Sequence, residues 1–229
     1  MTTRSEPTSS AAASPRRSVA KGILEFVAHV VDDTKFALAG LKGRGHPKPL
    51  TKWDEQYRTG HWRYLDSAAE IAHYMVIVGY VQQFCHNPTV LDVGCGHGRL
   101  FQLLRRYPYR SYLGIDHSAE SLRQARPFEG KDVRFELTDF SRFIPAEHFD
   151  AIVFNESIYY APRPAEVLHR YVSALTNDGV MIVSMCENRW QKAIWNTLES
   201  VAETVHSTAV TSENDRTWHV RVLRPVSAK

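Results

Sequence analysis

From residue 68 onward, the hydrophobic positions follow two alternating patterns. Apolar residues spaced three or four apart predict helices, and short apolar runs rich in β-branched residues predict strands. This alternation predicts an α/β fold with a doubly wound, mostly parallel sheet. The expected helices cover 68–84, 100–107, 119–125, 162–175 and 189–205. The first expected strand begins at Val90, and the others cover 112–116, 132–137, 149–155, 179–185, 208–213 and 217–223.

The first expected helix, 68–84, should pack on the sheet through its apolar face. Ile71, Met75, Val78 and Val81 recur at helical spacing along this segment and define that face. The helix should lead directly into the first strand at Val90.

The chain before this helix has a different character. Residues 1–17 are rich in Ser, Thr, Ala and Pro, which predicts a disordered tail. From Val19 to Val30 the pattern is that of a short amphipathic helix, which can pack on the domain, form a dimer interface or rest on lipid. Residues 41–49 are expected to form a basic, flexible linker. We therefore divide the chain into a tail (1–17), a segment with helix, linker and lid (18–66), and the main domain (67–229).

A glycine-rich stretch, Val90-Leu91-Asp92-Val93-Gly94-Cys95-Gly96-His97-Gly98, stands at the start of that domain. It reads as a strand, a tight turn and the beginning of a helix. Residues without a Cβ let the backbone adopt left-handed angles and lie directly against a ligand. The stretch therefore predicts a binding site for a nucleotide-like ligand.

The spacing of the glycines and the positions of two acids limit which class of nucleotide-like ligand is expected. The glycines run G-x-G-x-G, whereas a dinucleotide site needs G-x-G-x-x-G. Asp92 would repel a pyrophosphate and suits a cationic ligand. Asp116 ends the next strand 18 residues after Gly98, near the offset at which an acid binds ribose hydroxyls. The ligand is expected to be a nucleoside with a positive centre.

Val-Leu-Asp-Val-Gly-Cys-Gly-x-Gly followed by Gly-Ile-Asp resembles the class I S-adenosylmethionine-dependent methyltransferases, over about residues 53–225. The resemblance implies S-adenosylmethionine as cofactor and a seven-stranded sheet of order 3-2-1-4-5-7-6. It implies that Asp92 and the glycines hold the aminocarboxypropyl group and that Asp116 holds the ribose. Asp139 would meet the adenine amino group, with Phe140 packed on the ring. The cofactor residues expected in the domain are Asp92, Gly94, Cys95, Gly96, Asp116, His117, Asp139, Phe140 and Asn155.

An aromatic-rich segment, residues 53–65, precedes the domain. Aromatic clusters are often part of a core. The pattern W-D-x-x-Y-x-x-G-x-W-x-Y-L nevertheless resembles segments that fold over the cofactor in small bacterial methyltransferases. We therefore expect an N-terminal helical lid in which Tyr57 and Trp62 contact the cofactor.

Methyl transfer requires a positioned acceptor and, where necessary, removal of its proton. Glu156 follows the fourth strand and is a candidate base, an anchor for an ammonium group, or an acid favoured by a helix N-terminus. Tyr159 and Tyr160 either line the acceptor site or pack in the core. His61 in the lid is the second catalytic candidate, and His219 and Glu213 are further ones. No spacing of carboxylates and histidines suggests a metal site.

The charge distribution, one local motif and the cysteine content bear on the expected partners and compartment. Residues 1–64 hold 11 Lys/Arg against 6 Asp/Glu, which fits a basic arm for nucleic acid or an anionic membrane, or a solvated tail. The stretch after the fourth strand lacks the prolines of enzymes that methylate nucleic-acid amines, so no nucleic acid is expected. Three scattered cysteines fit a reducing cytoplasm, and no apolar run is long enough for a transmembrane helix.

The sequence thus predicts an enzyme that methylates a small molecule, foremost a hydroxyl of a sugar or specialised metabolite. Methylation of a small amine or amino sugar is the alternative. A cofactor-binding partner subunit without activity is more remote, because the acids and glycines of the cofactor site are intact. A homodimer is compatible with the sequence.

Overall fold

The computed structural model describes residues 44–188 and 191–226, which belong to one compact unit, Ala39–Lys229. The predicted tail, 1–17, and the predicted amphipathic helix near Val19 lie outside the described residues. The division of the chain at residues 17 and 66 remains a prediction. No helix in the described ranges has the length and apolar character needed to cross a bilayer.

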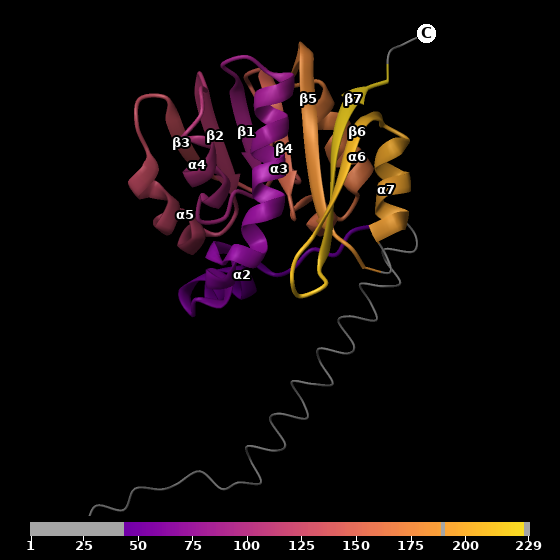
Figure 1. The fold of residues 1–229 in the computed structure, drawn as a ribbon. Helices are drawn as coiled ribbons and strands as arrows, with labels where there is room; N and C mark the ends of the chain where they lie inside the picture. The colour runs from indigo at the N-terminus through magenta and orange to yellow at the C-terminus, as the bar shows by residue number, and fades with distance from the viewer. Residues whose placement is uncertain (1–43, 189–190, 227–229) are drawn as a thin grey trace, which may run out of the picture. The chain divides into compact units, whose positions relative to one another are not determined.

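A seven-stranded sheet of order β3-β2-β1-β4-β5-β7-β6 forms the centre of this unit (Figure 1). The first five strands of that order are mutually parallel, and β7 runs antiparallel to both of its neighbours. The predicted strand order and fold class are confirmed. The strands are β1 (Thr89–Val93), β2 (Ser111–Asp116), β3 (Val133–Leu137), β4 (Phe149–Asn155), β5 (Leu175–Cys186), β6 (Ala202–Thr211) and β7 (Thr217–Pro225).

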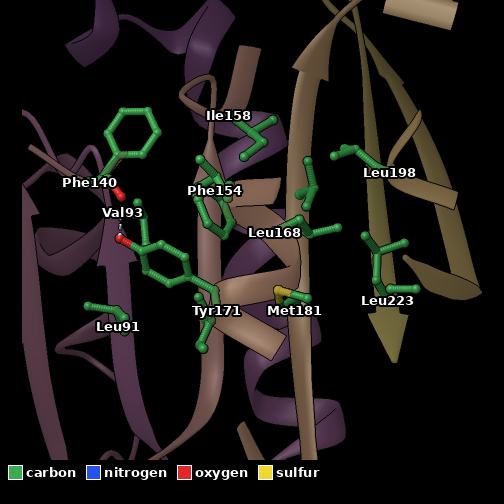
Figure 2. Close-up of a cluster of buried hydrophobic side chains, with 14 of the residues drawn as sticks. Leu91, Val93, Phe140, Phe154, Ile158, Leu168, Tyr171, Met181, Leu198 and Leu223 are labelled. Atoms are coloured by element: carbon green, nitrogen blue, oxygen red, sulfur yellow. Dashed lines mark hydrogen bonds between the residues drawn. The ribbon is translucent and has the colours of Figure 1, made fainter. Parts of the chain in front are cut away.

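Helices cover both faces of the sheet, and the central strands are therefore buried on both sides. Side chains of α6 (Pro164–Val172) and α7 (Gln191–Glu199) join one hydrophobic cluster, part of which Figure 2 shows. Side chains of α3 (Ala68–Phe84), α4 (Arg99–Leu104) and α5 (Ala119–Ala125) join a second cluster. Successive residues of β1 alternate between the clusters, with Val90 in the second and Leu91 in the first.

Helix α3 has the predicted bounds, but its buried face differs from the predicted one. Val78 and Val81 are buried as expected, whereas Ile71 and Met75 are only partly buried. The rest of the buried face consists of Glu70, His73, Tyr74 and Ile77. The first turns of α3 thus bury polar side chains, which the apolar pattern did not reveal.

The prediction of one helix over 189–205 is wrong in its second half. Helix α7 ends at Glu199, and β6 begins at Ala202. The apolar residues Val201 and Val205 are four positions apart, which imitates a helical pattern. Pairing with β7 decides the conformation, since β6 is an edge strand with mostly exposed side chains and no alternating signal. Two other helices are shorter than predicted, α4 ending at Leu104 and α6 covering Pro164–Val172.

The part of the predicted flexible linker that the structure describes is packed against the domain. The backbone N–H of His46 donates a hydrogen bond of 2.8 Å to the carbonyl oxygen of Tyr159. Gly45 lies so close to the chain after β4 that a Cβ there would be 2.0 Å from the carbonyl oxygen of Ala161. Residues 44–49, which we call the strap, therefore lie along the segment that follows β4.

Candidate active site

The glycine loop has the backbone that its sequence predicts. Gly94, Gly96 and Gly98 have φ angles of 77°, 56° and 79°, which only glycine adopts without strain. The N–H groups of Gly94 and Cys95 donate to the carbonyl oxygen of Ile115, at 2.8 and 3.0 Å. These bonds fix the loop to the end of β2.

The chain after β4 closes the other side of this loop. Ser157 Oγ donates a hydrogen bond of 2.6 Å to the carbonyl oxygen of Val93. A Cβ at Gly94 would lie 2.6 Å from the Cβ of Ser157, so only glycine fits there. Glu156, the residue before Ser157, is therefore held next to the glycine loop.

Two buried carboxylates flank the loop. Asp92 is 2% exposed, and its Oδ2 accepts a hydrogen bond of 2.5 Å from the hydroxyl of Tyr112. Burial raises the pKa of Asp92 to about 7. Asp116 accepts hydrogen bonds from the N–H groups of Gly96 and Ser118 at 2.9 and 2.8 Å. Burial raises the pKa of Asp116, whereas these two hydrogen bonds lower it. A cationic ligand would stabilise the ionised Asp92, so this pair fits a nucleoside with a positive centre.

The third motif lies at the end of β3. Asp139 Oδ1 accepts the N–H of Ser141 at 2.9 Å, and the Asp139 side chain remains 46% exposed. The ring of Phe140 belongs to the first hydrophobic cluster, 6.5 Å from the ring of Phe154 (Figure 2). Asp139 therefore remains accessible at the carboxyl end of the sheet, where the cofactor prediction requires it.

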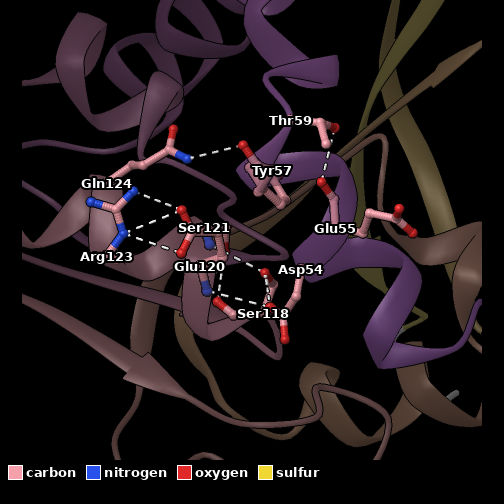
Figure 3. A network of polar contacts seen from close by, with 9 residues as sticks. All are labelled: Asp54, Glu55, Tyr57, Thr59, Ser118, Glu120, Ser121, Arg123 and Gln124. Carbon is pink, nitrogen blue, oxygen red and sulfur yellow. Dashed lines mark hydrogen bonds and ion pairs between the residues drawn. The ribbon is translucent and has the colours of Figure 1, made fainter. Parts of the chain in front are cut away.

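The predicted lid consists of helix α2 (Leu50–Arg58) and the 3₁₀ helix η1 (His61–Asp66). Polar contacts join α2 to the start of α5, as Figure 3 shows. Asp54 Oδ1 accepts the hydroxyl of Ser118 at 2.6 Å and the N–H of Glu120 at 3.3 Å. The lid is thus attached directly beside Asp116.

Aromatic side chains of the lid lie against the glycine loop. A Cβ at Gly96 would be 2.5 Å from the hydroxyl oxygen of Tyr57, whose side chain is buried. The ring of Trp62 lies 5.9 Å from that of Tyr57 and stacks on Trp53 at 5.5 Å. The Trp53 ring in turn lies 6.1 Å from that of His117. The predicted residues Tyr57, Trp62 and His117 are therefore brought together with the loop.

Glu156 stands at the opposite wall of the site, at the end of β4. Its φ angle is 54°, and its N–H donates to the carbonyl oxygen of Ser184 at 3.0 Å. Oε2 accepts the hydroxyl of Tyr159 at 3.0 Å, whereas Oε1 is buried and has no hydrogen-bond partner among the described residues. Burial raises the pKa of Glu156 to about 8, which is suitable for a base near neutral pH.

Two charged residues that the sequence analysis did not select lie beside Glu156. Arg216 Nη1 is 2.6 Å from Glu70 Oε1, and the guanidinium lies 4.8 Å from the ring of Trp218. The charge of Glu70 raises, and that of Arg216 lowers, the pKa of Glu156. The expected strands 208–213 and 217–223 place Arg216 in the turn between them, but nothing in the sequence marked Glu70 within its helix.

The remaining base candidates are less favourably placed. His61 is exposed on η1, with its ring 5.1 Å from that of Trp62. His219 Nε2 lies 3.7 Å from Glu187 Oε2, and Glu213 is exposed in the hairpin between β6 and β7. In the described part of the chain, no group of three metal-binding side chains gathers. Glu156 is the candidate base that is buried beside the glycine loop.

Comparison with known proteins identifies the family of the domain. A family described as "Methyltransferase domain" matches residues 86–221. The trans-aconitate 2-methyltransferase of Variovorax paradoxus (strain S110) is 33% identical over 102 residues, which are 44% of this chain and 39% of the relative. The corresponding enzyme of Klebsiella pneumoniae (strain 342) is 32% identical over 115 residues, 50% of this chain and 45% of the relative. The match thus covers less than half of the length of these relatives.

Solved structures share the fold. The N-methyltransferase NodS from Bradyrhizobium japonicum WM9, solved with S-adenosyl-l-homocysteine, has a TM-score of 0.63 and 19% identity, covering 72% of this chain and 92% of NodS. A putative methyltransferase in complex with the Haloferax volcanii Trm112 activator has a TM-score of 0.59 and 15% identity, covering 75% of this chain and 97% of that one. The chain belongs to the class I S-adenosylmethionine-dependent methyltransferases.

Proposed function

We propose that this enzyme transfers a methyl group to a hydroxyl of a small molecule and that Glu156 is the general base. The observation that carries the proposal is the buried Oε1 of Glu156, which has no partner among the described residues. Glu156 directly precedes Ser157, whose side chain packs on Gly94 of the glycine loop. A hydroxyl bound at Oε1 would be next to the site expected for the cofactor.

The protein's contribution is positioning, proton removal and exclusion of water. S-adenosylmethionine supplies a methyl group that is already activated on a sulfonium. Asp92 and Asp116 would hold its charged and ribose groups, and Tyr57 and Trp62 would cover it. Glu156 would accept the proton of the acceptor at Oε1 while Tyr159 holds Oε2.

The charges near Glu156 favour an acceptor that donates a hydrogen bond. Two carboxyl groups, Glu70 and Glu156, face one guanidinium, and Arg216 is already paired with Glu70. A neutral hydroxyl adds no charge to this site. A small amine also donates a hydrogen bond and remains the alternative acceptor, whereas an anion would disfavour the ionised form of Glu156 on which proton removal depends.

The names of the relatives suggest a different acceptor. Trans-aconitate is a tricarboxylate, and methylation of a carboxylate requires no base. Such an acceptor would add negative charge beside Glu70 and Glu156, and Arg216 is already paired with Glu70. Trans-aconitate is therefore the reference compound against which hydroxyl and amine acceptors must be compared.

The proposal is tested by incubating the full chain with radiolabelled S-adenosylmethionine and panels of sugars, phenols, small amines and trans-aconitate. We expect transfer to a hydroxyl compound. Glu156→Gln should lower turnover by ~10²–10⁴-fold and leave S-adenosylhomocysteine affinity unchanged. Glu55→Gln, an exposed lid residue, is the matched control and should behave as wild type.

Three results would contradict the proposal. Transfer to trans-aconitate alone, with full activity of Glu156→Gln, would show that no base is needed. Loss of turnover in His61→Ala but not in Glu156→Gln would move the base to the lid. Tight cofactor binding without transfer to any panel compound would support a partner subunit without activity.

A further inference from the structure

We propose that Tyr159 is a positioning residue for the Glu156 carboxyl and that the strap, residues 44–49, holds Tyr159 in place. This inference rests on the proposed role of Glu156 as base. It assigns a function to a segment that the sequence analysis treated as a linker.

The backbone of Glu156 is fixed on both sides. Its N–H is bound to the carbonyl oxygen of Ser184 on β5, and Ser157 Oγ is bound to Val93 on β1. The left-handed φ of 54° turns the chain out of β4 into the 3₁₀ helix η3 (Ile158–Tyr160). A non-glycine residue rarely adopts this conformation, so the surrounding contacts impose it.

Among the described residues, a side-chain hydrogen bond to the Glu156 carboxyl reaches Oε2 and none reaches Oε1. Tyr159 is three residues further along, and its hydroxyl donates to Oε2 at 3.0 Å. This bond sets the orientation of the carboxyl plane and leaves Oε1 for the acceptor. Removal of the bond would let the carboxyl rotate about its terminal torsion, which has a broad energy minimum.

The strap determines where Tyr159 lies. The N–H of His46 donates to the carbonyl oxygen of Tyr159 at 2.8 Å. Gly45 lies so close that a Cβ there would be 2.5 Å from the same oxygen. Lys48 Nζ lies 5.0 Å from the ring centroid of Tyr160 and 5.1 Å from that of Trp53 in the lid. The strap therefore joins the lid to the residues that orient Glu156.

Tyr159 is also the contact that most favours ionisation of Glu156. Burial raises the pKa of Glu156, and the hydrogen bond from Tyr159 opposes this more than any other interaction does. A hydrogen bond from the backbone of Cys186 and the charge of Arg216 act in the same direction, and the charge of Glu70 acts against them. Glu156 in turn raises the pKa of Tyr64 and Tyr160. These groups come from η1, α3, η3, β5 and the hairpin before β7.

The inference is tested without an acceptor, by carbon-13 NMR of the full chain labelled at the glutamate carboxyl carbon and saturated with S-adenosylhomocysteine. The resonance that titrates near pH 8 and disappears in Glu156→Gln belongs to Glu156. In Tyr159→Phe its midpoint should rise by about one pH unit, because a hydrogen bond to the ionised form is lost. Gly45→Ala, which displaces the carbonyl of Tyr159, should shift the midpoint in the same direction by less.

Two matched variants serve as controls. Tyr107 is 40% exposed, and a Cβ at Gly130 would meet no atom of the described residues within 4 Å, its two chain neighbours aside. Tyr107→Phe and Gly130→Ala should therefore leave the Glu156 titration unchanged. An unchanged midpoint in Tyr159→Phe would overturn the positioning role, and an unchanged midpoint in Gly45→Ala alone would overturn the role of the strap.

Failure of this inference and failure of the proposed function give different results. If Glu156→Gln keeps full turnover while Tyr159→Phe shifts the titration, Glu156 is oriented as described but is not the base. If Glu156→Gln abolishes turnover and Tyr159→Phe changes nothing, Glu156 is the base and Tyr159 does not position it.

Discussion

Arg216 and Glu70 form an ion pair of 2.6 Å across 146 positions of the chain. Glu70 is 3% exposed, whereas the side chain of Arg216 is 43% exposed. The pair joins the first turn of α3 to the hairpin before β7. It therefore connects the helix that follows the lid to the hairpin whose Arg216 acts on Glu156, the proposed base.

Arg216→Ala should destabilise the fold in a pH-dependent manner. Burial already raises the pKa of Glu70, and the loss of Arg216 raises it further. A carboxyl with a raised folded pKa stabilises the fold at low pH, and this stability is lost as pH rises through that pKa. The variant should lose about 1–3 kcal/mol in unfolding free energy at neutral pH and less at acidic pH.

Denaturant unfolding at several pH values measures this difference. Glu70→Gln in the Arg216→Ala background should remove its pH dependence. Arg142→Ala is the control, because that side chain is 89% exposed and its pairing with Asp139 contributes little. A deficit of Arg216→Ala that is the same at all pH values would contradict the explanation.

S-adenosylmethionine should bind more tightly as pH rises to about 7. Asp92 has a pKa of about 7 in the free protein, and a cationic ligand favours its ionised form. Binding below this pKa should therefore release a proton. Calorimetry in two buffers of different ionisation enthalpy counts that proton.

Two variants identify Asp92 as the source of the released proton. Asp92→Asn should abolish the release. Tyr112→Phe should move the release to higher pH, because the tyrosine hydroxyl stabilises the carboxylate. Proton release that persists in Asp92→Asn would assign it to another group.

Asp116→Ala should weaken S-adenosylhomocysteine binding by ~1.5–3 kcal/mol, the range for hydrogen bonds to charged groups. It should also lower the melting temperature, because Asp116 holds the N–H groups of Gly96 and Ser118. Asp116→Asn keeps one carbonyl oxygen as acceptor, so its affinity for S-adenosylhomocysteine should fall between those of wild type and Asp116→Ala. Calorimetric affinity equal to that of wild type would reject the ribose contact.

Asp54→Ala should accelerate cofactor dissociation, because Asp54 attaches the lid to Ser118 and Glu120 (Figure 3). The neighbouring Glu55 is exposed, so Glu55→Ala is the matched control. Stopped-flow fluorescence of the lid tryptophans gives the rate constant. Equal dissociation rates in the two variants would show that Asp54 does not control lid opening.

The sequence was sufficient for the central strands of the sheet, because each of them is an apolar run that ends at a turn. The bounds of α3, α5 and β4 agree with their predicted ranges. The edge strand β6 was missed in part, since its exposed residues show no alternation and its conformation depends on pairing with β7. Local pattern cannot reveal a conformation that pairing with another strand imposes.

The same limit applies to the site. Glycines and acids at the ends of β1 and β2 have fixed spacings, so the sequence could point to Asp92 and Asp116 as cofactor residues, an assignment that stays a prediction. Glu70 and Arg216 have no common motif, and only the fold brings them together. The bond between Tyr159 and Glu156 depends on the left-handed backbone of Glu156. A sequence marks a left-handed position through a glycine, and no glycine stands there.

The strand order also separates the two halves of the site. Most candidate cofactor residues lie in or directly after β1, β2 and β3, whereas Glu156 and the groups that act on it come from β4, η3, β5, α3 and the hairpin before β7. The two sets come together where β1 lies beside β4 and where Trp53 of the lid contacts Tyr160. Replacement of the β6–β7 hairpin should therefore alter which compound is methylated, while the affinity for S-adenosylmethionine is retained. In the same way, acceptor preference can diverge among homologues without changes in the nucleoside site.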